Sequence, residues 1–254
     1  MANFALQLYT VREPAKRDWR GTLKRIRDIG YEYVQWSGMP ELPAEEIRRG
    51  LDEAGLKAIA GHASVENFEK DFAKELLFWK TVGVVHLAPG GMPGDARDSL
   101  EAWMRGAARL DKIGSALREA GIQYSYHNHA FEFEKFPGDD RCKLDILLAA
   151  TRPANLSWEC DTAWVHYGGE DPAAYLRKYA GRCPIIHIKD VARDAPEDKP
   201  VFTELGRGLL DWDAVLGAAR DAGVEWYAYE QDTCPGDPLE SAKISYEFLK
   251  ANIR

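Results

Sequence analysis

Imidazole and carboxylate groups recur in this chain of 254 residues at positions that suit a metal site. The stretch at 124–134 reads YSYHNHAFEFE, with two histidines one residue apart and two glutamates after them. Farther along, two more acidic residues and another histidine each come at the end of a short apolar run. The candidate ligands are His127, Glu132, Asp161, His187 and Glu230.

These nitrogen and oxygen donors form a mixed set that suits a divalent ion better than a thiolate site would. One ion, Mn²⁺, Zn²⁺, Co²⁺, Mg²⁺ or Fe²⁺, is therefore the expected cofactor. Such an ion could hold two adjacent oxygens of a polyol or hydroxyketone and stabilise an enediolate as a Lewis acid. A carboxylate close to the bound carbon would then move the proton.

The elements that must position these groups alternate between short strands and longer helices. Strands are expected at 4–10, 33–37, 57–63, 84–88, 123–129, 156–161, 184–190 and 226–232. Helices are expected at 19–30, 43–55, 65–83, 98–121, 142–150, 171–181, 211–223 and 237–249. Eight such units of roughly 30 residues predict a (β/α)8 TIM barrel, with residues 1–254 as a single domain.

The competing architecture is a doubly wound open sheet, which usually carries a glycine-rich phosphate loop after its first strand. Here the first strand leads into TVREPAKRDW, without that pattern, so the barrel is preferred. Barrel enzymes carry their chemistry at the carboxyl ends of the strands. His62, His86, His127, Asp161 and His187 are expected there, with Glu230 at the end of the last strand.

Each of these residues also has a purely structural interpretation. A lone histidine on an apolar strand, such as His62 or His86, is more often a core residue than a ligand. Asp161 could simply cap a helix, and Lys189 could be a surface lysine. Trp36, Trp164 and Tyr9 could stack on a sugar ring, whereas Trp158 is expected to face the helices. Convergence of four strand ends on one mouth is what favours a functional site.

Composition narrows the class of protein. The net charge of −8 disfavours a nucleic-acid partner, and no run approaches the ~20 apolar residues of a membrane span. The start MANFALQLYTVRE does not resemble a signal peptide. Four scattered cysteines without a CxxC pair predict free, mostly buried thiols and a cytoplasmic protein.

The motifs YHNHAFEFE, CDTAW, HIKD, ELGRGLLDW and YEQD follow one another at the expected strand ends. In this order they resemble the sugar phosphate isomerase/epimerase family, the xylose isomerase-like barrels, over nearly the whole chain. The resemblance implies one divalent metal held by residues of strands five to eight. By position, Asp161, His187 and Glu230 match the metal ligands, Glu230 could also serve as an acid/base, and Arg193 matches a substrate-binding arginine.

The chain departs from the epimerase pattern at two positions. Where those enzymes have a glutamate at the end of strand five, this chain has His127, which is the first choice for the fourth ligand, with Glu132 as the second. His129 becomes a candidate base, as in dehydratases of related barrels, and Lys189 a contact for an enolate oxygen. Trp164 stands where a histidine is common.

The expected substrate is a small sugar or keto-polyol, contacted by His62, Trp164, Arg193 and Arg207. The GRG at 206–208 is either a phosphate-binding loop or a plain turn. Isomerisation or epimerisation is the first expectation and dehydration of a keto-sugar or keto-inositol the second. The alternatives from other classes are a sugar-binding barrel without catalysis and the endonuclease branch of these barrels. Assembly into a homo-oligomer is left open.

Overall fold

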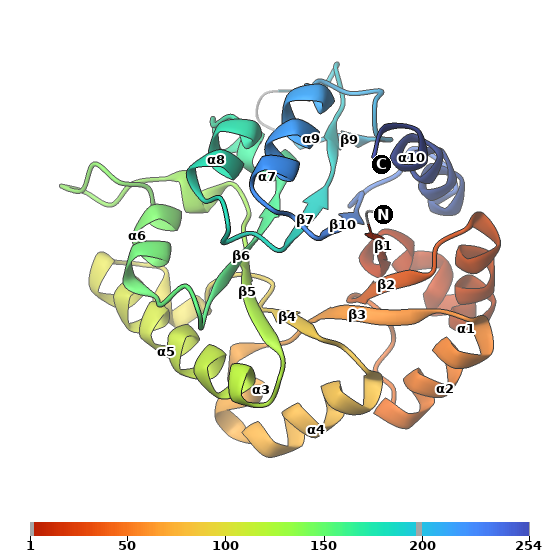
Figure 1. Cartoon of the computed structure of the whole chain (residues 1–254), viewed down its shortest axis with the longest axis horizontal. Helices are drawn as coiled ribbons and strands as arrows, with labels where there is room; N and C mark the ends of the chain where they lie inside the picture. Colours follow the sequence, from red (N-terminus) through yellow and green to blue (C-terminus); the bar gives the residue numbers. More distant parts are fainter. Residues whose placement is uncertain (1–2, 197–199, 254) are drawn as a thin grey trace.

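The computed structural model describes residues 3–196 and 200–253, and within them eight parallel strands close into a barrel. Figure 1 shows the strands at the centre and a ring of helices outside them. Each strand pairs with its sequence neighbours, and the last pairs with the first. The strands are β1 (Asn3–Gln7), β2 (Tyr33–Trp36), β3 (Lys57–His62), β4 (His86–Ala88), β5 (Gln123–His127), β6 (Ser157–Asp161), β7 (Ile185–Ile188) and β10 (Trp226–Tyr229).

Helices connect the strands and cover the outside of the barrel. They are α1 (Arg12–Ile29), α2 (Ala44–Ala54), α3 (Val65–Lys70), α4 (Phe72–Val82), α5 (Leu100–Glu119), α6 (Lys143–Ala150), α7 (Thr162–Tyr167), α8 (Pro172–Lys178), α9 (Trp212–Asp221) and α10 (Pro238–Asn252). Short 3-10 turns lie at Leu8–Val11, Gly94–Ala96 and Phe131–Phe133. Two short strands after β7, β8 (Asp190–Val191) and β9 (Phe202–Thr203), form an antiparallel hairpin. The (β/α)8 prediction is confirmed.

Two of the helices differ from their predicted extents because an aspartate interrupts them. The segment expected as one helix at 65–83 breaks at Asp71, whose side chain caps α4 by accepting the N–H of Lys74. Helix α1 begins well before residue 19, but Asp18 has non-helical angles (φ −154°, ψ 87°) and accepts the N–H of Gly21. Helix-capping aspartates can thus start a new helical segment inside a longer one.

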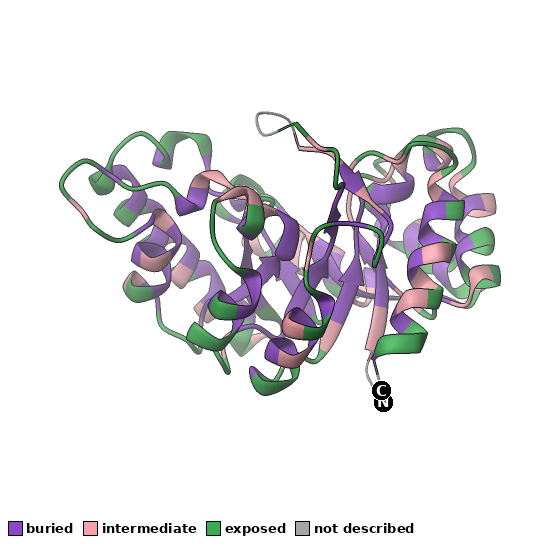
Figure 2. Ribbon diagram, turned by 90° about the horizontal axis from the view of Figure 1, so that it is seen from above, coloured by how far each residue is buried: buried purple, intermediate pink, exposed green. Residues whose placement is uncertain are grey.

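Side chains alternate between the barrel interior and the helix layer along each strand. In β6, Glu159 and Asp161 contact interior residues, whereas Trp158 packs against Tyr175 and Tyr179 at the end of α8. Trp158 therefore faces the helices, as predicted. Figure 2 shows buried residues filling the strands and the inner faces of the helices.

Two further expectations can be compared with the structure. His86 begins β4 rather than ending it, because this strand has only three residues, and its buried Nδ1 has no hydrogen-bond partner. It therefore belongs to the barrel interior and not to the mouth.

All four cysteines are free, and Cys142, Cys160 and Cys183 are buried. Among the described residues, no helix is both long and apolar enough to span a membrane.

Candidate active site at the barrel mouth

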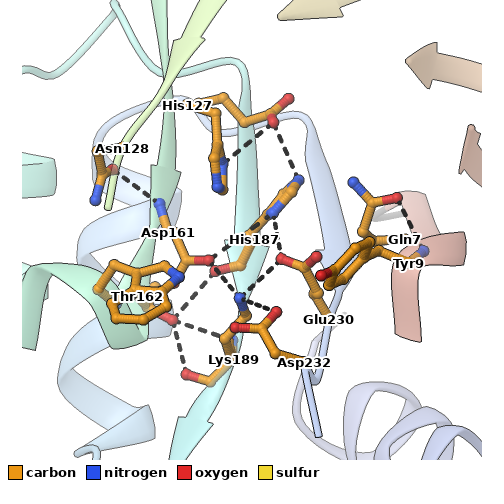
Figure 3. Close-up of polar contacts among 12 residues, drawn as sticks. Gln7, Tyr9, His127, Asn128, Asp161, Thr162, His187, Lys189, Glu230 and Asp232 are labelled. Carbon is orange, nitrogen blue, oxygen red and sulfur yellow. Dashed lines mark hydrogen bonds and ion pairs between the residues drawn. The ribbon is translucent and has the colours of Figure 1, made fainter. Parts of the chain in front are cut away.

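A cavity of about 380 Å³ opens at the carboxyl ends of the strands. Several strands contribute to its wall, because parallel strands in a barrel all end at the same rim. Figure 3 shows the polar side chains gathered there. The residues lining the cavity are Tyr9, Ser37, His62, Gly90, His127, His129, Trp164, Lys189, Glu230 and Asp232.

The predicted ligands from four consecutive strands come together at this mouth. One donor atom from each of His127, Asp161, His187 and Glu230 lies within 4.8 Å of the others. His187 Nδ1 lies 2.9 Å from Glu230 Oε2 and 3.9 Å from Asp161 Oδ2. The two imidazoles and two carboxylates are all buried and form the mixed donor set that divalent metals prefer.

Two polar atoms of this group are buried and make no well-aligned hydrogen bond. Asp161 Oδ2 has the ion-pair contact with Lys189 Nζ at 2.9 Å, and His127 Nδ1 lies 3.5 Å from Glu159 Oε1. Buried polar atoms usually have hydrogen-bond partners, so each one requires an explanation. Asp161 Oδ2 can accept further contacts beside the donor atoms of the other three residues, so the residues fit a metal.

Lys189 projects from the end of β7 into a group of three carboxylates. Its Nζ lies 2.9 Å from Asp161, 2.8 Å from Glu230 and 3.0 Å from Asp232. Burial opposes the ammonium charge, but the three carboxylates raise the pKa of Lys189 well above its ordinary value. Burial, only partly offset by Lys189, and the neighbouring Glu230 raise the pKa of Asp161. Burial opposes a charge on His187 as well, but Glu159 and Glu230 raise the pKa of His187 to about 10, so it is a second cation beside these groups. Three carboxylates still outnumber the two cations, and a metal ion would balance the remaining negative charge.

Glu159 lies one layer deeper in the barrel and contacts three histidines. Its Oε1 is 2.7 Å from His62 Nε2, 3.1 Å from His187 Nε2 and 3.5 Å from His127 Nδ1. The amide of Gln35 donates to both carboxylate oxygens at 3.1 and 3.2 Å. Despite complete burial, His187 and His62 hold the pKa of Glu159 well below its ordinary range. It is therefore an anion inside the barrel.

Sequence reasoning missed Glu159, although a signal was available. It stands two residues before Asp161 in a strand, and residues two apart share one face. His62, His127, Glu159 and His187 form a second group of potential ligands in the described chain. His187 joins the two groups, because its Nδ1 faces the mouth and its Nε2 faces Glu159 and Gln35.

The structure does not bring Glu132 into the ligand group. The 3-10 turn at 131–133 points this carboxylate back into the fold, where it accepts Tyr126 O–H at 2.6 Å and the backbone N–H of His129 at 2.8 Å. Burial raises the pKa of Glu132 to about 7. Of the two choices for the fourth ligand, only His127 is therefore placed to act.

His129 lies in the cavity wall, 5.4 Å from Trp164 and 5.0 Å from His127 between ring centroids. Burial first, and then the positive charge of Lys189, lower the pKa of His129 to about 4. The imidazole is therefore neutral near pH 7 and has a free lone pair. His129, which the sequence suggested as a base, thus lines the cavity, and its role as a base stays a prediction. His62 and Trp164 also line the cavity, as expected for substrate contacts.

Arg193 and Arg207 do not reach this cavity. Both are exposed, and the Nη1 atom of Arg207 lies 3.5 Å from Glu204. The GRG loop is held instead by Asp190, whose carboxylate accepts five hydrogen bonds. The donors are the backbone N–H groups of Val191, Gly206, Gly208 and Leu210 and the indole N–H of Trp212. A phosphate bound by this loop would need the same N–H groups. Because the carboxylate of Asp190 already accepts from them, the loop is a turn held by Asp190.

Comparisons with known proteins identify the family to which the fold belongs. A family model described as a xylose isomerase-like TIM barrel matches residues 23–252. A curated inosose dehydratase from Lacticaseibacillus casei is 27% identical over 169 residues, which make up 60% of this chain and 55% of that protein. The chain thus spans about half the length of the curated relatives it matches.

Solved structures resemble the whole chain. A sugar phosphate isomerase/epimerase from Parabacteroides distasonis superimposes with a TM-score of 0.85 at 18% identity, covering 99% of this chain and 94% of that one. An L-ribulose 3-epimerase gives 0.76 at 16% identity, with coverages of 100% and 95%. An IolI protein with a bound zinc atom gives 0.73 at 16%, with coverages of 98% and 97%. At these identities the likeness is one of fold.

Proposed function

Since the chain belongs to the family of xylose isomerase-like TIM barrels, we propose that it is a divalent-metal-dependent enzyme that removes a proton next to a carbonyl group of a small polyhydroxylated compound. One observation carries the proposal. Two members of the buried ligand group of His127, Asp161, His187 and Glu230, namely His127 and Glu230, line one cavity together with a neutral imidazole, His129, and a fixed ammonium, Lys189.

Those four residues would hold the metal, because all four are buried and one donor atom from each lies close to the other three. When bound there, a divalent ion supplies Lewis-acid polarisation of substrate oxygens. An IolI protein of the same fold carries zinc, which supports a metal in this chain without deciding which one. Manganese, named first from the sequence, stays a prediction.

The chain's own groups account for the proton transfer. His129, with its pKa lowered to about 4, is unprotonated at neutral pH and lines the cavity, so it can accept a proton from a bound carbon acid. Lys189 keeps its charge and is held in place by carboxylates, so its positive charge can stabilise the substrate oxygen that becomes negative. Trp164 forms part of the wall beside both groups.

We propose elimination as the first candidate reaction. Isomerisation or epimerisation, the first expectation from the sequence, becomes the second. Inversion at one carbon requires an acid/base on each face of the substrate, whereas the carboxylates of this mouth all come from β6 and the end of β10, around Lys189. The β5 side presents imidazoles. Inosose dehydratases among the relatives support a dehydratase-type lyase. Isomerase or epimerase activity remains the second candidate, supported by an epimerase of the same fold.

The turn closed by Asp190 indicates a substrate that carries no phosphate at that position. A sugar or keto-polyol fits the polar mouth and its aromatic wall. A cytoplasmic location, the lack of a nucleic-acid partner and a possible homo-oligomer stay predictions from sequence.

The test begins with metal content. Protein purified without chelator is analysed by elemental mass spectrometry, alongside His187→Ala and, as a matched control, His166→Ala at an exposed position on α7. We expect near-stoichiometric metal in the wild type and the control, and loss in His187→Ala. Metal-loaded protein should also exchange solvent deuterium into inosose or a ketose, and Glu230→Ala should not. Absence of metal from reconstituted wild-type protein would favour the binding barrel without catalysis.

A further inference from the structure

A second cavity, of about 540 Å³, adjoins the one at the barrel mouth. Both cavities are lined by Ser37 and His62, so they meet at the ends of β2 and β3. The second cavity extends outward from this point, between the loop at 37–43 and the helices α3 and α4. It is larger than the cavity that holds the candidate catalytic groups.

Its lining combines apolar surface with a polar rim. Trp36 and Trp79 are almost fully buried beneath it, and Met39 and Phe78 are half-buried in its wall. The indole N–H of Trp79 already donates to Glu75 at 2.8 Å, so this residue offers the cavity its apolar ring. Exposed polar side chains, Asn67 and Lys74 among them, lie at the edge. A ring with an apolar face and hydroxyl groups at its edge matches such a surface.

The loop at the boundary between the two cavities has little room to move. Gly38 has φ +67°, and a Cβ atom there would lie 2.5 Å from the ring of Tyr9. Tyr9 lines the first cavity, and the guanidinium of Arg12 lies 4.0 Å above its ring. The loop at 37–43 is therefore packed closely against a residue of the mouth, which keeps the second cavity beside the first.

We infer that the second cavity is a substrate subsite, which takes a ring joined to the reacting keto-sugar. The substrate class is then a keto-glycoside with a phenolic ring as its other half, because a free keto-monosaccharide in the mouth would leave the larger cavity unfilled and its aromatic lining uncovered. This inference rests on the proposed function for what occupies the mouth. The shared residues Ser37 and His62 lie where the linkage between the two rings would pass.

The test compares two probes, methyl and phenyl 3-keto-β-D-glucoside, on protein reconstituted with Mn²⁺. Dissociation constants are measured by calorimetry, and solvent deuterium incorporation is followed by mass spectrometry. Asn67→Trp fills the cavity from its rim, since the side chain of Asn67 is exposed and only its backbone takes part in the helix cap. Glu66→Trp, exposed on the same helix and outside the cavity lining, is the matched control.

We expect the phenyl compound to bind roughly tenfold more tightly than the methyl compound in the wild type and in Glu66→Trp. Asn67→Trp should lose that preference and still bind the methyl compound. Equal affinities in the wild type, a preference that survives Asn67→Trp, or no binding of either compound at millimolar concentration would each overturn the subsite. A phenyl preference without deuterium incorporation would instead retain the subsite and reject the proposed proton abstraction.

Discussion

Replacing Glu159 with glutamine should weaken metal binding although Glu159 does not face the mouth. The carboxylate lies 3.1 Å from His187 Nε2, on the side of the ring opposite the Nδ1 atom that faces Asp161 and Glu230. A carboxylate that contacts the other ring nitrogen of a metal-binding histidine fixes the tautomer and orientation of that histidine. Glutamine keeps the shape, removes the charge and turns an NH₂ group toward neighbouring donors.

The magnitude follows from the contacts that are lost. Glu159 receives close contacts from His62, His187 and Gln35, of which an amide oxygen can keep one or two. Losing one member of a buried charged pair costs roughly 3–5 kcal/mol of folding free energy. For the metal, loss of the carboxylate that contacts His187 Nε2 should cost about 10–100-fold in affinity. Both effects should appear together.

The assay is competition for Zn²⁺ or Mn²⁺ with a chelator of known affinity, combined with urea unfolding of the metal-free protein. Glu204→Gln is the matched control, because Glu204 is also a buried carboxylate and accepts the hydroxyl of Ser241 at 2.8 Å, away from the site. It should lose stability and keep metal affinity. Unchanged affinity in Glu159→Gln would refute the orienting role. Complete loss of binding would make Glu159 a ligand itself, in the deeper group with His62, His127 and His187.

Two other substitutions test the neighbouring anions. Because burial raises the pKa of Glu132 from 4.5 to about 7, its protonated form contributes about 3 kcal/mol of stability that is fully present below pH 4.5 and lost as pH rises to 7. Glu132→Gln should remove this dependence, and parallel pH profiles of urea unfolding for the two proteins would contradict the reasoning. Asp190→Asn should destabilise the fold by roughly 3–6 kcal/mol, since an amide cannot accept from donors on both of its former oxygens. A change below about 1 kcal/mol in the same unfolding assay would show that the five hydrogen bonds do not hold the loop.

The fold could be predicted because local signals agreed with one another. Short apolar strands recur in all eight units, several of the helices between them begin after an aspartate or end before a glycine, and a barrel is the closed arrangement of such repeats. What was missed depended on partners in space. The start of β4 at His86 is set by its pairing with β3 and β5, which composition does not encode. The breaks at Asp18 and Asp71 depend on which aspartates turn back to cap a following N–H group.

The candidate site shows the same division. Asp161, His187 and Glu230 could be grouped from sequence because strand ends of a barrel converge. Glu132 was misplaced because a single turn after β5 decides whether its carboxylate faces the mouth or Tyr126. Arg193 and Arg207 were expected to contact the substrate, but both are exposed. They lie in loops, and the conformation of a loop cannot be read from the identity of its side chains. Glu159 was missed because its partners, among them Gln35 and His62, lie on other strands of the barrel. The sequence alone does not show which side chains face an acidic residue across the barrel.

Asp190 also has a consequence for how this barrel could evolve. It follows Lys189 directly in the chain, and its carboxylate ties the end of β7 to the loop that leads into α9. An anion could bind in that loop only if the hydrogen bonds to Asp190 were lost. Those hydrogen bonds fix the end of β7, from which His187 and Lys189 reach the mouth. The loop at 37–43 can change without such a loss, because it carries none of the proposed ligands. New specificities should therefore arise by exchange of that loop, with the catalytic half of the barrel inherited unchanged.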